Sequence, residues 1–93
     1  MTHLTPQNFQ TEVAQGRVLV CVYGSAQPPR ELEHLCGDRL KCCRLDAEAY
    51  EELLPALKIL RLPVGLLWED GRIVQRIQGA LSLSDYAKIL NLD

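Results

Sequence analysis

The hydrophobic positions of this chain fall into short runs separated by turn-forming residues, a pattern typical of a small α/β sheet. Runs that are mostly apolar or β-branched predict strands buried on both faces. An Asp-Gly pair lies between the last two runs and is a strong hairpin signal, so these two strands should be antiparallel neighbours. The expected strands are residues 17–23, 40–45, 64–68 and 72–77.

Residues that favour helix ends mark two helices in the first half of the chain. Thr5 followed by Pro6 predicts an N-cap and a first helical position, and Gly16 predicts the end of that helix. A second, short helix is expected to begin near residues 28–29 and to end at Gly37. This second helix connects the first two predicted strands.

Two more helices are expected in the second half. Residues 47–57 have helical apolar spacing, but Pro55 removes a backbone donor there and should kink the helix or split it in two. Ser82 with Asp85 has the pattern of a capping box, which predicts a last helix over residues 83–92. Strands joined through helices need crossover connections and are therefore parallel. The pattern predicts an α/β domain with a mixed sheet of parallel strands plus a C-terminal antiparallel hairpin, flanked by helices.

Composition narrows the classes of function. The 93 residues suffice for one small domain, and the net charge is −2 at pH 7. No basic run is interleaved with aromatic residues, so no nucleic-acid partner is expected. The apolar runs are far shorter than a membrane span, and the chain starts without a secretory signal pattern. We therefore expect a soluble cytoplasmic protein with reduced cysteines, no membrane association and no cofactor.

Four short motifs resemble the thioredoxin family, and the match covers almost the whole chain. Leu62-Pro63-Val64 resembles the Ile-Pro-Thr that carries the family's cis-proline, and Gly79-Ala80-Leu81-Ser82 matches the Gly-Ala-Leu-Ser after its hairpin. Val18-Leu19-Val20 resembles the family's Val-Leu-Val strand, and Arg44-Leu45-Asp46 resembles its Lys-Val-Asp. The resemblance implies one thioredoxin-like domain over residues 1–93, with a cis peptide bond before Pro63.

The family's catalytic motif is missing from this chain. Thioredoxins carry Trp-Cys-Gly-Pro-Cys after the Val-Leu-Val strand, where a helix N-terminus lowers the thiol pKa. Aligned without a gap, this chain has Ala26-Gln27-Pro28-Pro29-Arg30, so Gln27 and Arg30 replace both cysteines. The family's buried aspartate is replaced by Cys21. No catalytic residue is therefore expected at this position, and dithiol chemistry is excluded there.

The segment after the motif is shorter than the family pattern. Between Pro29 and Asp46 roughly eight residues are missing, equivalent to about two helical turns. The helix after the motif loop should be shortened and should leave apolar surface less covered. Exposed apolar patches usually mark contacts, so we expect a homodimer that partly covers this region.

The cysteines favour structural roles. Cys21 lies inside an apolar strand, and Cys36 lies at a helix C-terminus, where the helix dipole disfavours a thiolate. Cys42 and Cys43 should point to opposite faces of their strand, and a ring between them would be strained. A zinc site of Cys36, Cys42 and Cys43 lacks the paired short spacings of such sites, and His34 should face solvent, so no metal is expected.

A peptide groove is the remaining candidate site. In the family three loops meet at one end of the sheet, and here they correspond to residues 26–30, 62–64 and 78–80. The proline can serve the backbone alone, or Leu62 can present free backbone groups that pair with an extended peptide. The candidate groove residues are Gln27, Pro29, Arg30, Leu62, Pro63 and Gly79.

These observations leave three hypotheses of function. The first is a redox-inactive thioredoxin-like domain that binds a protein or peptide partner or acts as a chaperone-type module. The second is a thiol-disulfide oxidoreductase in cell redox homeostasis that works through a non-standard cysteine. The third is a structural subunit of a larger assembly.

Overall fold

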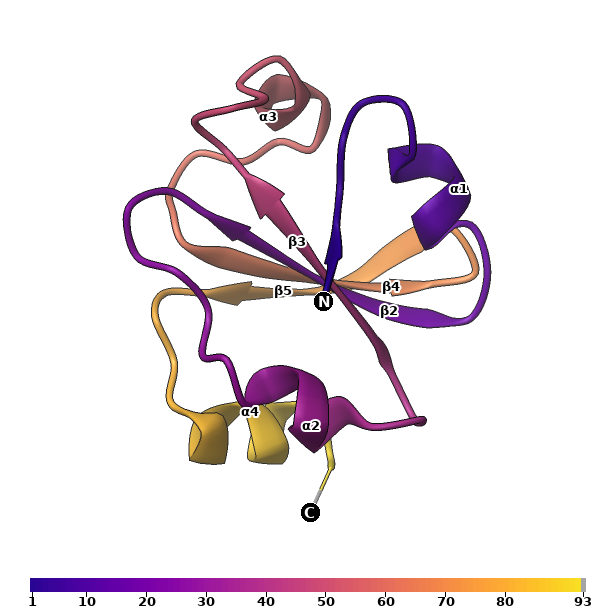
Figure 1. Ribbon diagram of the computed structural model, residues 1–93, viewed down its shortest axis with the longest axis vertical. Helices are drawn as coiled ribbons and strands as arrows, with labels where there is room; N and C mark the ends of the chain where they lie inside the picture. The colour runs from indigo at the N-terminus through magenta and orange to yellow at the C-terminus, as the bar shows by residue number, and fades with distance from the viewer. Residues whose placement is uncertain (93) are drawn as a thin grey trace.

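A computed structural model describes residues 1–92 and places one five-stranded sheet between two layers of short helices (Figure 1). The strands are β1 (Thr2–His3), β2 (Arg17–Tyr23), β3 (Lys41–Asp46), β4 (Val64–Glu69) and β5 (Arg72–Gln78). The helices are α1 (Phe9–Val13), α2 (Leu32–Cys36), α3 (Leu53–Ala56) and α4 (Leu83–Ile89).

The sheet is mixed, as the pattern predicts. Its strand order is β1-β3-β2-β4-β5; β1 and β2 both run parallel to β3, while β4 runs antiparallel to β2 and to β5. Strand β1 was not expected, because two residues give no periodic signal. The other four strands lie within one residue of their predicted ends. The α/β class, the mixed sheet and the flanking helices are therefore confirmed.

Strand β2 divides the interior into two cores. Val18, Val20 and Val22 point into a cluster that packs with α1 and the segment around α3. Leu19 and Cys21 point into a second cluster on the side of α2 and α4. Figure 1 shows the same division, with α1 and α3 on one side of the sheet and α2 and α4 on the other. Burial on both faces explains the continuous apolar run of β2.

The predicted hairpin is present and is anchored to the loop after α1. Asp70 and Gly71 have φ values of 49° and 86°, the left-handed conformations that a two-residue hairpin turn requires. The Gly16 N–H donates to Asp70 Oδ1 at 2.8 Å, and the Asp70 N–H donates to the Gly16 carbonyl at 2.9 Å. These two bonds fix the far end of the hairpin.

The first helix begins later than predicted. Thr5 caps a turn instead of the regular helix: the Asn8 N–H donates to Thr5 Oγ1, and the Thr5 N–H donates to Asn8 Oδ1 at 2.7 Å. Asn8 is the N-cap of the helix, which starts at Phe9. The reciprocal bonds satisfy the first backbone donors in the turn, so the regular helix starts only after them.

The predicted helix over residues 47–57 is largely wrong. Only α3 is helical there, and residues 47–49 and 51–52 form turns. Asp46 Oδ1 accepts from the backbone N–H of Glu48 at 2.9 Å, which holds the chain in a turn after β3. Pro55 has no N–H to continue a longer helix. The expectation that Pro55 kinks this helix or splits it in two is not confirmed, because Pro55 lies inside the single helical turn of α3.

The two helices on the other side end where the backbone turns left-handed. Gly37 has φ 55° and ends α2 as predicted. Helix α4 ends before residue 92, contrary to the prediction: Asn91 has φ 58°, and the Leu92 N–H returns to the Ala87 carbonyl at 2.8 Å. This closure is a Schellman motif, with asparagine in the place that glycine often takes. Within residues 1–92, none of these helices has the length and apolar composition needed to span a bilayer.

The capping box of α4 gives the first testable prediction. Ser82 Oγ accepts from the Asp85 N–H at 3.1 Å, and the Asp85 carboxylate accepts from the Ser82 N–H. Ser82→Ala should therefore lower the free energy of unfolding by about 1 kcal/mol. Ser84→Ala, at an exposed position of the same helix, should change it by less than about 0.5 kcal/mol. Urea unfolding measures both, and equal effects would contradict the capping role.

Candidate functional site

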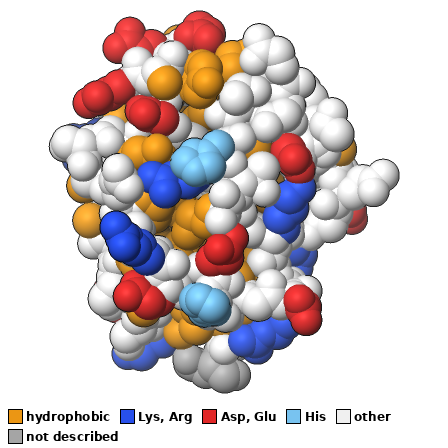
Figure 2. Space-filling view, in the orientation of Figure 1, with side chains coloured by type: hydrophobic (Ala, Val, Ile, Leu, Met, Phe, Trp, Pro, Cys, Tyr) orange, Lys and Arg blue, Asp and Glu red, His pale blue; other side chains and the backbone are white. Residues whose placement is uncertain are grey.

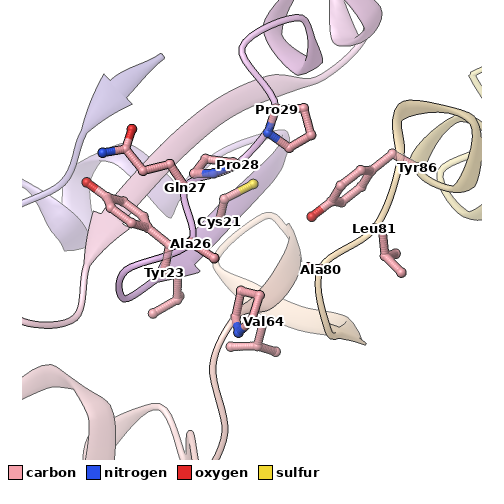
Figure 3. Close-up of a pocket in the computed structure, with 12 residues that line it drawn as sticks. Cys21, Tyr23, Ala26, Gln27, Pro28, Pro29, Val64, Ala80, Leu81 and Tyr86 are labelled. Carbon is pink, nitrogen blue, oxygen red and sulfur yellow. The ribbon is translucent and has the colours of Figure 1, made fainter.

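Three loops meet at one end of the sheet and enclose a cavity of about 150 Å³ (Figure 3). Its walls come from the loop after β2, from the start of β4 and from the loop before α4. The Cys21 sulfur and the Tyr86 hydroxyl point toward one another across it. The lining residues are Cys21, Val22, Tyr23, Ala26, Gln27, Pro28, Pro29, Pro63, Val64, Ala80, Leu81 and Tyr86. The cavity is mostly apolar, and the Tyr86 hydroxyl points into it.

The loop before β4 is held in place through its neighbours. The Leu62–Pro63 peptide bond is cis, as expected. The Gly79 N–H donates to the Pro63 carbonyl at 2.9 Å. The Gln78 side chain donates to the carbonyls of Arg61 and Pro63 at 3.2 and 3.1 Å. Gly79 has φ 97°, so a side chain there would be strained.

Leu62 itself keeps its backbone free. Within residues 1–92, neither its N–H nor its carbonyl takes part in a hydrogen bond. Leu62 is 40% exposed. Its Cδ1 atom packs beside Gly24: a Cβ added to that glycine would lie 3.5 Å from it. Free backbone groups beside an apolar cavity are what an added strand would require.

Arg44 on β3 positions the loop of residues 26–30, which we call the motif loop. Arg44 was not identified as a site residue from the sequence. Arg44 Nη2 donates to Gln27 Oε1 at 2.9 Å. The Arg44 guanidinium carbon lies 4.7 Å from the centroid of the Tyr23 ring, within the range of a cation–π contact. The sequence offers no local signal for this contact, because Gln27 and Arg44 meet only after β2 and β3 have paired.

Arg30 lies beside a different hollow from Leu62. It is exposed and precedes α2, and it lines a polar hollow of about 320 Å³ together with His3, Glu33 and Arg44. The loop residues Gln27, Pro28 and Pro29 line both this hollow and the apolar cavity. Of the six candidate groove residues, Gln27, Pro29, Arg30 and Pro63 line one or both of these depressions, and Leu62 and Gly79 line neither.

Charge is mixed on the face shown in Figure 2. Acidic side chains gather at the top of this view, and basic and acidic side chains are interspersed below, with hydrophobic patches between them. Among residues 1–92, no group of three or more His, Cys, Asp or Glu is placed to hold a metal ion.

All four cysteines are buried and none forms a disulfide in the described chain. Cys42 and Cys43 point into opposite cores, as predicted. Burial raises the pKa of the Cys21 thiol to about 12, and the neighbouring thiols of Cys36 and Cys43 add to this. Burial likewise raises the pKa of Tyr86 to about 12. The cavity wall is therefore neutral at physiological pH.

The expectation for Cys36 was wrong in direction. Cys42 Sγ donates to Cys36 Sγ across 2.7 Å, and this contact lowers the pKa of Cys36 and raises that of Cys42. Helix α2 has only five residues, so its dipole is small beside a direct donor. The sulfur pair forms because the turn after Gly37 returns the chain beside α2.

No protein-family model matches this chain, and no curated protein matches it either.

Alkaline pH should destabilise the fold through Cys21. Its folded pKa is raised from 9.0 to about 12, so the stabilisation is complete below pH 9 and is lost as the pH rises toward 12. Between pH 8 and pH 11, wild type should lose about 2 to 3 kcal/mol more unfolding free energy than Cys21→Val, which has no thiol to ionise. Urea unfolding under reductant measures both unfolding free energies. If they change equally between pH 8 and pH 11 in wild type and Cys21→Val, the raised pKa of Cys21 is contradicted.

Proposed function

We propose that this chain is a thioredoxin-like domain that is redox-inactive at its motif position and binds an extended segment of a protein partner, as a binding or chaperone-type module. One observation carries the proposal: the unpaired backbone of Leu62 lies beside the apolar cavity. The order of parallel strands, antiparallel hairpin and covering helices supports the family assignment. So does the meeting of the three loops that the resemblance implies.

Binding would use two complementary contacts. An extended peptide pairs its main chain with the N–H and carbonyl of Leu62, which gives affinity without sequence preference. One of its side chains enters the cavity, whose volume of about 150 Å³ suits a group of the size of a benzene ring. Bound segments should therefore be extended and should carry a phenylalanine or leucine.

The polar hollow adds a preference for acidic neighbours. Arg30, Arg44 and His3 line it, and Glu33 is the only carboxylate among its lining residues. Within residues 1–92, Arg30 makes no ion pair. A carboxylate of the partner that enters this hollow would pair with the Arg30 guanidinium. The hollow lies on the other side of the motif loop from the cavity. The partner segment is therefore apolar at one position and acidic near it.

The burial of the thiols argues against the oxidoreductase hypothesis. The motif positions hold Gln27 and Arg30, and the four cysteines are between 0% and 6% exposed. Cys36, Cys42 and Cys43 do not line the cavity, so a protein disulfide cannot reach them in the folded domain. Cys21 does line it, but burial raises the pKa of its thiol to about 12, so the nucleophilic thiolate is not formed at physiological pH. Exchange with protein substrates is therefore not the function we propose.

Self-association remains a prediction. The large apolar side chains that are exposed lie at Leu60, Leu62, Val74 and Ile89, outside α2 itself. Ile89 lies on α4, which packs beside the shortened α2. Any homodimer contact over this region would therefore be centred on α4.

The peptide proposal can be tested with a labelled heptapeptide of threonine and glutamate that has one central phenylalanine. Leu62→Asp should weaken its binding about tenfold, equivalent to about 1.4 kcal/mol, because the new charge stands next to Pro63, which lines the cavity, and repels the acidic peptide at the backbone with which it pairs. Leu60→Asp is the matched control: Leu60 is 97% exposed and neither of its chain neighbours lines the cavity, whereas Leu62 directly precedes the lining residue Pro63, so binding to Leu60→Asp should match wild type. Fluorescence anisotropy measures both.

A peptide with serine in place of the phenylalanine serves as the second control. It should bind wild type at least tenfold more weakly. Equal binding of the two peptides, or Leu62→Asp binding as well as wild type with unchanged circular dichroism, would place the interface elsewhere.

The acidic preference can be tested separately at Arg30. Arg30→Glu should weaken binding of the phenylalanine peptide several-fold at low salt, and the difference should shrink at high salt because the contact is exposed. Arg72→Glu, which makes the same charge change at the Asp-Gly hairpin, controls for net charge. An equal loss in both variants would mean that overall charge, and not a contact at Arg30, sets the preference.

A further inference from the structure

Two buried cysteines face each other within the core between the sheet and α2. Cys36 is the last residue of α2, and Cys42 is the second residue of β3. Their Sγ atoms lie 2.7 Å apart, closer than two non-bonded sulfur atoms normally pack. A disulfide bond is about 2.05 Å long, so the two sulfurs need only a small further approach to bond.

We propose that Cys36 and Cys42 form an oxidisable dithiol, a modification site that a small peroxide converts into an intramolecular disulfide. This inference does not depend on the peptide-binding proposal. It concerns the chain's own covalent state and requires no protein substrate.

The geometry selects this pair from the four cysteines. Cys43 points into the opposite core, on the other side of the sheet, so it cannot bond to Cys36 or Cys21. Cys21 shares the core of the pair, but among the described residues no hydrogen bond joins its sulfur to that of another cysteine. A ring between the neighbours Cys42 and Cys43 would be strained. Only Cys36 and Cys42 are in contact.

Because both sulfur atoms are buried, only a small oxidant can reach them. Cys36 is 0% exposed and Cys42 is 6% exposed, so a bulky disulfide such as oxidised glutathione cannot approach either sulfur. Hydrogen peroxide is close to water in size and can enter a packed interior through local fluctuations. The contact with Cys42 lowers the pKa of Cys36 and so favours the thiolate, which is the nucleophilic form.

The chemistry balances with one peroxide for each pair. The Cys36 thiolate attacks one peroxide oxygen; an S–O bond forms, the O–O bond breaks, and the hydroxide that leaves takes up a proton to become water. Cys42 Sγ then attacks Cys36 Sγ, the S–S bond forms, and the S–O bond breaks. The departing hydroxide takes the Cys42 proton and leaves as a second water. Two thiols and one peroxide give one disulfide and two waters, with two electrons passing from sulfur to oxygen.

The disulfide would fasten the end of α2 to β3. Helix α2 is short and has no side-chain cap at its N-terminus, so it depends on packing for its position. A bond from its last residue to the sheet restricts the unfolded chain and holds the helix. The melting temperature should rise by roughly 5–15 °C on oxidation.

The test is oxidation of the folded full-length chain with hydrogen peroxide, followed by blocking of free thiols under denaturing conditions, trypsin digestion and non-reducing mass spectrometry. Cleavage after Arg30, Arg39, Lys41 and Arg44 separates residues 31–39 from residues 42–44. We expect these two peptides to be joined, with the loss of two hydrogens. Cys21, in the peptide of residues 18–30, should carry the blocking group.

Variants then identify the sulfur atom within the Cys42-Cys43 pair. Cys43→Ser should keep the cross-link and Cys42→Ser should lose it. Oxidation in urea should give a mixture of pairings, because the contact exists only in the folded chain. This control uses the wild-type sequence and does not depend on any variant folding.

Several outcomes would overturn the proposal. These are free thiols at both Cys36 and Cys42 after peroxide, a link through Cys21 or Cys43, and a pairing pattern that is the same in urea as in buffer. A glutathione adduct on Cys36 in the folded chain would overturn the assignment of a small oxidant. An oxidised chain that melts at or below the temperature of the reduced chain would overturn the bracing of α2.

Discussion

Burial of β2 on both faces is the constraint on which the rest of the structure depends. The strand lies between β3 and β4, and its side chains alternate between two separate cores, so each must be apolar or neutral. Position 21 meets this demand with a thiol whose pKa burial raises to about 12, where the thioredoxin pattern has an aspartate. The same strand ends beside the loop before β4 and leads the chain into the motif loop. The central strand therefore fixes the cores and also sets where the candidate site lies.

The candidate site is held by contacts from the sheet and is largely preformed. Gly79 and Gln78 fix the loop that contains Pro63, and Arg44 fixes Gln27 while its guanidinium lies over Tyr23. These groups already have their partners. Leu62 differs from them, because its backbone groups have no hydrogen bond among residues 1–92. A site with fixed walls and free backbone groups loses little conformational entropy when an extended chain is added, which favours binding.

Local patterns were enough to predict much of the fold, while contacts between distant segments were not. The four longer strands, the Asp-Gly hairpin and the cap of α4 each depend on neighbouring residues, and all were predicted. The helix over residues 47–57 failed because the Asp46 side chain and Pro55 compete with its apolar spacing. The three loops were placed by family resemblance. The role of Arg44 and the contact between Cys36 and Cys42 arise only when strands and helix pack, so no spacing rule shows them.

The proposed peptide groove and the proposed oxidisable cysteine pair occupy separate parts of this domain. The proposed groove lies at the end of the sheet, and its lining includes Cys21 but neither Cys36 nor Cys42. The sulfur pair lies in the core beneath α2, away from the free backbone of Leu62. A peptide bound at the groove would therefore leave the burial of the pair unchanged, and a disulfide in the core would leave the hydrogen-bonding groups of Leu62 free. Gln27 and Arg30 stand where the thioredoxin pattern has its cysteines, and all four thiols of this chain lie where packing buries them.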